Sequence, residues 1–132
     1  MNTNDASMRV LDALAKAWND QDVEAALACF GDDAVYHDAF GPDALGASHR
    51  GLPAIRDALV ATFAAFPKAR LLAVGGILAA PDGRAASEWL FEHVDAGGAR
   101  HELHGCDIYL IEGGKVKVKN AFVKCRIPGA SN

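Results

Sequence analysis

The sequence predicts an α+β fold in which N-terminal helices cover one face of an antiparallel β-sheet. In the first half of the chain, apolar residues recur at three- and four-residue spacing, which is typical of helices. From residue 68 onward this period gives way to strand-like segments joined by short glycine-rich connections. Such connections indicate sequential antiparallel hairpins, and helices that precede all the hairpins indicate the α+β class.

Three helices are predicted ahead of the hairpins. The first covers residues 5–19, whose apolar residues share one face. Asp22 is a suitable N-cap for a second helix, and Gly31 suits its C-terminal stop. Pro53 is well placed in the first turn of the third helix, where its missing N–H group is harmless, and Pro67 ends this helix.

The strands follow the same order along the chain. A short strand covers residues 33–39, and residues 40–51 are expected to form a loop. The later strands are predicted at residues 68–80, 84–94, 99–112 and 115–126. Their interiors carry few charges on either side, so we expect the outer sheet face to be covered as well, by the second subunit of a homodimer.

Composition narrows the class of protein. A chain of 132 residues with a net charge of −4 is expected to form a single domain, residues 1–132, with no nucleic-acid partner. The lysines near the C-terminus are interpreted as a solvated or edge-protecting face. No apolar run reaches membrane-spanning length, so no membrane partner is expected. Cys29, Cys106 and Cys125 are widely spaced, which favours free thiols and a cytoplasmic location.

An aspartate in an otherwise apolar strand is the best functional clue. Asp107 shares a strand face with Gly105 and Tyr109, and that face carries no other charge between residues 103 and 111. It should therefore point toward the helices, where burial favours the protonated acid. A protonated acid can donate a hydrogen bond to a developing oxyanion. The alternative is a structural aspartate paired with an arginine or with backbone amides.

A second carboxylate, Asp38, ends the first predicted strand. Aspartate is common in turns, so a purely structural role has equal weight. The functional interpretation makes Asp38 a general base at the rim of a cavity, with Tyr36 on the same face as a phenol donor.

Aromatic side chains are expected to form the pocket wall. Trp89, Phe91 and His93 alternate on one strand face, and a hydrogen-bonded structural role is favoured for His93 over acid–base chemistry. If the last strand is regular, Asn120 and Phe122 face the same cavity. The predicted substrate-contacting residues are Leu14, Trp18, Phe63, Trp89, Phe91, His93, Asn120 and Phe122.

No metal or cofactor is expected. His101 and His104 would point to opposite faces of a strand, which makes a metal site with Glu102 weak. The glycine pairs form hairpin turns and no phosphate-binding loop follows a strand. Cys106 should face away from Asp107, which makes a thiol nucleophile improbable.

Several short segments carry a family resemblance. They are residues 19–25 and 30–38 around the first predicted strand, 50–56 and 65–67 at the two ends of the third helix, and 105–109 with 114–116 in the last hairpin. Together they resemble the nuclear transport factor 2-like superfamily, in particular its SnoaL-like polyketide cyclase and ketosteroid isomerase branches.

This resemblance implies a cone-shaped, strongly bent antiparallel sheet packed against the three helices, a cystatin-like α+β barrel with an apolar pocket open at one end. It implies that Asp38 is the proton-shuttling aspartate of the isomerases and Asp107 their neutral oxyanion-hole acid. The family's oxyanion-hole tyrosine falls at Leu14, so Tyr36 or Tyr109 would have to replace that donor.

Two functions follow as expectations. The first is an isomerase- or lyase-type enzyme that performs cofactor-free proton abstraction next to a carbonyl on a small hydrophobic substrate. Asp38 would be its base and Asp107 its protonated stabiliser, with Tyr36 and Tyr109 as auxiliary donors. The alternative is a non-catalytic module for small-molecule binding or assembly with the same fold.

Overall fold

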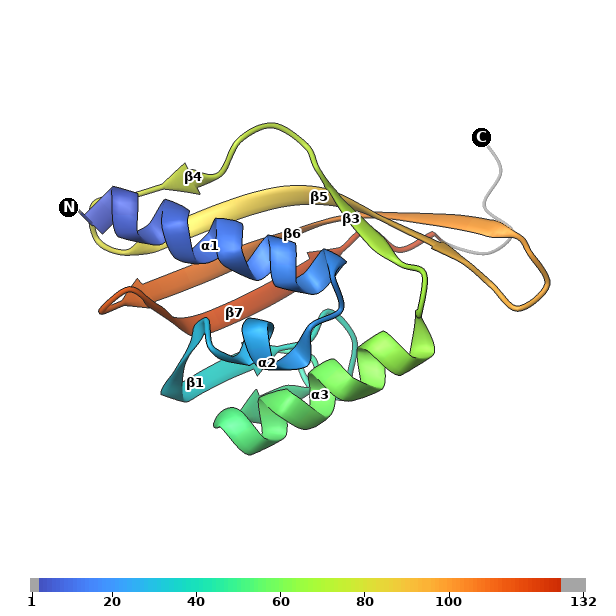
Figure 1. Ribbon diagram of the computed structural model, residues 1–132, viewed down its shortest axis with the longest axis horizontal. Helices are drawn as coiled ribbons and strands as arrows, with labels where there is room; N and C mark the ends of the chain where they lie inside the picture. Colours follow the sequence, from blue (N-terminus) through green and yellow to red (C-terminus); the bar gives the residue numbers. More distant parts are fainter. Residues whose placement is uncertain (1–2, 127–132) are drawn as a thin grey trace.

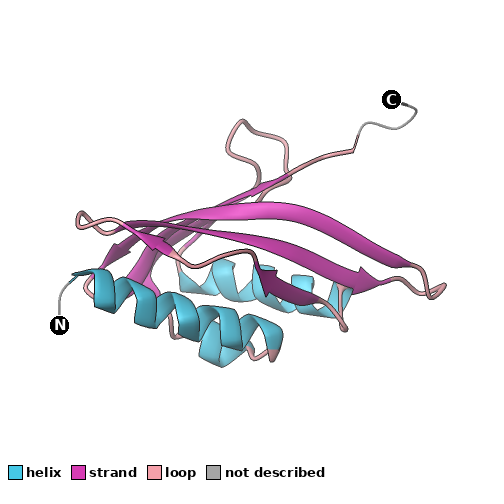
Figure 2. Cartoon of the chain, turned by 90° about the horizontal axis from the view of Figure 1, so that it is seen from above, coloured by secondary structure: helices cyan, strands magenta, loops and turns pink. Residues whose placement is uncertain are grey.

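The structure, a computed structural model, describes residues 3–126. Its elements in chain order are α1 (Thr3–Asn19), α2 (Val23–Leu27), β1 (Phe30–His37), β2 (Ser48–Arg50), α3 (Leu52–Ala65), β3 (Arg70–Ala73), β4 (Leu78–Ala79), β5 (Arg84–Val94), β6 (Arg100–Glu112) and β7 (Lys115–Val123). The strands form one curved sheet of order β2-β1-β7-β6-β5-β3, with β4 on β5. The helices lie on one face of this sheet, which confirms the predicted α+β fold (Figures 1 and 2).

The helices form where their sequence signals indicated. Asp22 caps α2, and its side chain accepts a hydrogen bond of 3.0 Å from the backbone N–H of Ala25. α2 ends at Leu27, and Gly31, predicted as its stop, belongs instead to β1. Pro53 lies in the first turn of α3. None of the helices within residues 3–126 is long and apolar enough to cross a membrane.

The sheet is antiparallel except at one pair of strands. β5, β6 and β7 form the predicted consecutive hairpins. β1 instead runs parallel to β7, and β2 pairs antiparallel with β1 inside the predicted loop 40–51. The predicted strand 68–80 is divided into β3 and β4 by a link that contains Gly75, whose φ of 73° is unfavourable for other residues.

An irregularity in β7 reverses the side-chain pattern predicted for the last strand. Val116 lies opposite Ile111, but Val118 lies opposite Leu110, so one extra residue is inserted in β7. Beyond this bulge every side chain points to the other face. Lys119 therefore faces inward.

The predicted inward orientation of Asn120 and Phe122 is consequently wrong. Asn120 lies opposite Ile108, and Phe122 lies opposite Cys106, on the outer face of the sheet. The prediction assumed regular alternation from Val116, which the bulge interrupts.

The hydrophobic core lies between the sheet and the helices. α1 contributes Leu11 and Leu14, and α3 contributes Ile55 and Leu59, all of them buried. Tyr109 is part of the same core, so the face of β6 that carries Asp107 points toward the helices as predicted.

Candidate functional site

An interior cavity of about 250 Å³ lies between the concave sheet face and the helices. Most of its wall is aromatic or aliphatic, as expected for a site that takes an apolar ligand. The structure brings six of the predicted site residues to this cavity, namely Trp18, Tyr36, Asp38, Trp89, Phe91 and Asp107. Asp38 and Asp107, the two aspartates predicted to be catalytic, thus line a single cavity.

A second cavity, of about 590 Å³, opens between α1 and the link from β3 to β4. Leu14 and Tyr109 line this second cavity. The residues common to both cavities are Trp18, Leu71, Trp89, Asp107 and Lys119. Asp107 and Lys119 therefore belong to the wall of both cavities.

Asp107 is only 2% exposed and is surrounded by hydrogen-bond donors. Lys119 Nζ donates to its Oδ1 at 2.8 Å. Trp89 Nε1 and Tyr109 Oη donate to its Oδ2 at 2.9 and 3.0 Å. These three donors, one of which is the buried Lys119 ammonium group, suit a carboxylate, whose oxygens can only accept. Asp107 is therefore paired with a cation, as in the structural alternative, but this cation is a lysine and not an arginine.

Gly105 makes the contact between Trp89 and Asp107 sterically feasible. Gly105 on β6 lies directly opposite Trp89 on β5. A Cβ atom at position 105 would lie 2.5 Å from the Trp89 ring and 2.4 Å from the carbonyl oxygen of Phe122. The absence of a side chain at position 105 leaves the space that the indole occupies.

Lys119 is a site residue that the sequence analysis missed. Its side chain is only 9% exposed, and its Nζ lies 5.1 Å from the centre of the Tyr36 ring. Together with Lys115, Lys117 and Lys124, it belongs to the lysines that the sequence predicts to form a solvated or edge-protecting face. The available signal was Asp107 itself, because a buried carboxylate needs a cationic or multiply donating partner.

Asp38 lies at the rim, where its side chain is 35% exposed. Its backbone N–H donates to the carbonyl oxygen of Ala47 at 2.8 Å, which holds the end of β1 against the following loop. His49 Nε2 lies 3.9 Å from Asp38 Oδ2 and has no hydrogen-bond partner within the described residues. His49 was also missed, because β2 falls in a segment predicted to be a loop.

The two tyrosines remain phenols over the working range of pH. Burial raises the pKa of Tyr36 well above its usual value, and the nearby carboxylates of Asp38 and Asp107 add to this effect. Burial and Asp107 raise the pKa of Tyr109 in the same direction. Both side chains can therefore act as hydrogen-bond donors.

Two predicted contact residues lie inside the fold but line neither interior cavity. Phe63 packs edge-to-face against Trp18, with ring centres 5.2 Å apart, and belongs to the core. His93 lies between the rings of Phe66 and His101, with centres 4.8 Å away on each side. A structural role fits both residues.

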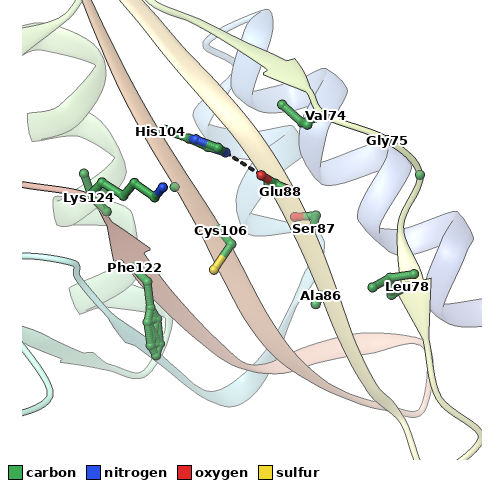
Figure 3. A pocket seen from close by; sticks show the side chains of 13 residues that line it. Val74, Gly75, Leu78, Ala86, Ser87, Glu88, His104, Cys106, Phe122 and Lys124 are labelled. Atoms are coloured by element: carbon green, nitrogen blue, oxygen red, sulfur yellow. Dashed lines mark hydrogen bonds and ion pairs between the residues drawn. The ribbon is translucent and has the colours of Figure 1, made fainter.

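The outer face of the sheet has a groove of about 670 Å³, which shares Gly75, Gly76, Ser87 and Glu88 with the second cavity (Figure 3). Phe122 and Cys106 line it, and His104 is paired with Glu88 there. Burial raises the pKa of the Cys106 thiol, and the charges of Asp107 and Glu88 add to this, so the thiol is not activated. Within residues 3–126 no group of three or more His, Cys, Asp or Glu side chains is placed to hold a metal ion.

Comparisons with known proteins are consistent with this architecture. Residues 11–118 match the family described as SnoaL-like domain. A putative polyketide cyclase from Xanthomonas campestris pv. campestris is similar, with a TM-score of 0.78 and 20% identity over 92% of each chain. A search of curated proteins found no match.

Two further structures show the same likeness. The epoxide hydrolase/cyclase-like enzyme SalBIII, described for pyran ring formation in salinomycin, gives a TM-score of 0.76 at 20% identity, over 89% of this chain and 90% of that one. A Mycobacterium tuberculosis protein in complex with estradiol-17beta-hemisuccinate gives 0.75 at 19% identity, over 89% and 92%. At these identities the likeness establishes a common fold.

Proposed function

Because this chain belongs to the SnoaL-like family of the nuclear transport factor 2-like superfamily, we propose that it is a cofactor-free enzyme of the isomerase or cyclase type. It would remove a proton next to a carbonyl group of a small hydrophobic substrate. One observation carries the proposal: Asp38 and the Asp107–Lys119 pair line the same largely apolar cavity. A carboxylate base and a positive charge that stabilises the developing oxyanion can together promote enolisation.

Asp38 is assigned the role of general base. Its carboxylate reaches both the cavity and solvent, so a proton taken from the substrate can be returned to it or exchanged with water. His49 Nε2, at 3.9 Å, is close enough to influence the orientation of this carboxylate.

The stabiliser in this proposal is the positive charge of Lys119. Charge developing on a carbonyl oxygen is stabilised most by preorganised donors in a site that excludes water. Asp107 would act by holding Lys119, and not as the protonated donor that the family resemblance implied. Tyr36 supplies a second donor in the same cavity.

The walls favour a ligand with a flat apolar body. Trp18, Trp89 and Phe91 surround the cavity with aromatic surface. The steroid ester bound by the Mycobacterium tuberculosis protein supports a screen that begins with polycyclic and aryl ketones.

The three cysteines within residues 3–126 are free, which fits a reducing, cytoplasmic compartment.

Exchange of α-protons tests the proposal directly. Enolisable ketones are incubated with the protein in D₂O, and loss of the α-proton signal is followed by NMR. Asp38→Asn should lower the exchange rate by roughly 10²–10⁴ because the general base is lost. Asp43→Asn, in the same loop but exposed, is the matched control and should exchange as the wild type does. Unchanged exchange in Asp38→Asn would reject the assignment.

A non-catalytic binding module is the second candidate. The buried Leu14, at the position of the family's oxyanion-hole tyrosine, favours it because one expected donor is missing. The same ketone panel separates the two candidates. Saturable binding without any protein-dependent α-proton exchange would support the binding module.

A further inference from the structure

We propose that Lys119 forms a covalent Schiff base with the carbonyl carbon of an aldehyde or ketone bound in the interior cavity. This rests on the proposed function and deepens it. It gives Lys119 a nucleophilic role in addition to an electrostatic one. It also restricts the substrate class to aldehydes and ketones, because esters and amides do not form iminium ions with amines.

The position of the lysine is the first argument. Lysines are almost never fully buried unless they are paired, and the Lys119 side chain, paired with Asp107, is 9% exposed and lines both interior cavities. Within residues 3–126 its one hydrogen-bond acceptor is Asp107 Oδ1, at 2.8 Å. An ammonium group carries three N–H donors. The nitrogen is thus anchored by one hydrogen bond, and its other near groups are the rings of Tyr36 and Tyr109, at 5.1 and 5.8 Å, so a ligand carbonyl would displace no second hydrogen bond.

The second argument concerns the proton. Attack on a carbonyl requires the neutral amine, and a desolvated lysine is a recurrent way of supplying it. Asp107 can accept the proton along the existing hydrogen bond, which leaves both groups neutral. Because burial away from water penalises two charges more than two neutral groups, the apolar surroundings lower the cost of this transfer.

The reaction balances with the groups present. The lysine nitrogen forms a bond to the carbonyl carbon, and the carbon–oxygen bond then breaks. The oxygen leaves as water with two of the three ammonium protons, the first of which passes through Asp107. The iminium ion keeps one N–H and one positive charge, so Asp107 still faces a cation. No oxidant or reductant is consumed.

Such an iminium ion would assist the proposed proton abstraction. It withdraws electrons from the neighbouring carbon more strongly than the parent carbonyl does. Asp38, on the wall of the same cavity, would take the acidified proton and produce a neutral enamine. Asp38 then returns the proton to carbon of the enamine, which forms the iminium ion of the product, and addition of water to this ion releases the product and restores the lysine.

Reductive trapping tests the inference on the full chain. The folded protein is incubated with phenylacetone and sodium cyanoborohydride, which converts an iminium ion into a stable secondary amine, and modified lysines are located by peptide mass spectrometry. Lys119 should be modified about tenfold faster than a solvent-exposed lysine, because the cavity concentrates the ketone beside it. Lys115 is exposed, and Lys117 is less buried than Lys119, so these neighbours on β7 are internal controls in the same sample.

Two variants provide additional evidence, but the labelling ratio in the wild-type protein is sufficient to decide the test. Lys119→Arg keeps the charge but removes the nucleophile and should lose the label, whereas Lys117→Arg should retain it. If Lys119→Arg does not fold, the ratio of labelling at Lys119 to Lys117 in the wild type still decides. Labelling of Lys119 equal to or below that of Lys117 would overturn the inference.

The trap and the exchange assay fail independently. Exchange that depends on Asp38 without labelling of Lys119 would reject the Schiff base and leave the proposed function standing. Labelling of Lys119 without α-proton exchange would support the Schiff base and count against the proposed function.

Discussion

Asp107 and Lys119 are charged side chains, and the burial of either one without the other would be energetically costly. Each is under 10% exposed, so each depends on the other for compensation. Loss of one member leaves an uncompensated charge, which costs more than the intact pair contributes.

Lys119→Met is therefore expected to lower the free energy of unfolding by about 3–5 kcal/mol, as measured by urea denaturation. Asp107→Asn in the Lys119→Met background should recover part of this loss, because the unpaired charge is removed. A single variant within about 1 kcal/mol of the wild type would show that the pair is better solvated than its burial implies.

The raised pKa values of Tyr36 and Tyr109 predict an alkaline loss of stability. In the unfolded chain a tyrosine ionises near pH 10, whereas the folded protein keeps both phenols neutral to higher pH. Their contribution is therefore complete below about pH 10 and is lost as the pH rises toward the folded values.

Urea denaturation between about pH 8 and 11 should show the free energy of unfolding falling above about pH 10. Tyr36→Phe removes one of the two ionisations and should make the fall shallower. An identical pH dependence in Tyr36→Phe would contradict the prediction.

At the scale of the element, the contact between β5 and β6 depends on Gly105. A methyl group there would meet the Trp89 ring and the backbone of β7 at once, and the backbone cannot move aside easily. Gly105→Ala should destabilise the protein by roughly 1–3 kcal/mol and alter tryptophan fluorescence, since the indole must leave Asp107. Gly97→Ala, in the open β5–β6 turn, is the matched control. Equal behaviour of the two variants would contradict this account.

The bulge in β7 has the largest consequence of any single element. The insertion of one residue between Val116 and Val118 places Lys119 in the cavity and Asn120 outside it. A strand without the bulge would present Asn120 to Asp107 instead. The chemistry of the site therefore depends on strand register.

At the scale of the whole molecule, the helices cover only one face of the sheet (Figure 2). The other face exposes Leu78, Ile108 and Phe122, which are 72%, 43% and 42% accessible. Glu88, which is paired with His104, and Lys124 lie at the groove on this face (Figure 3). The predicted homodimer would bury this surface.

Sedimentation should accordingly show a dimer whose population falls in Ile108→Lys, because a charge would be placed in an apolar contact. Val60→Lys, an exposed apolar position on α3, is the control and should not change the mass. A monomeric wild type at about 100 µM would reject the homodimer, since a stable interface is tighter than that.

The elements that depend on neighbouring residues could be predicted from the sequence. Helical periodicity, the Asp22 cap, the Pro53 start and the glycine turns act over a few positions, and all were found in the structure. The polar Asp107 on an apolar face also marked the site, because burial of a carboxylate is costly in any fold.

Which side chains complete the site depends on long-range contacts that local sequence patterns do not encode. Three features join residues that lie apart in the chain. They are the parallel pairing of β1 with β7, the short β2 that carries His49, and the bulge that turns Lys119 inward. Their physical basis is register, which is fixed by contacts across strands and between sheet and helices. A local sequence pattern carries no such information. It therefore identified the buried Asp107 but not Lys119, the lysine that is paired with it.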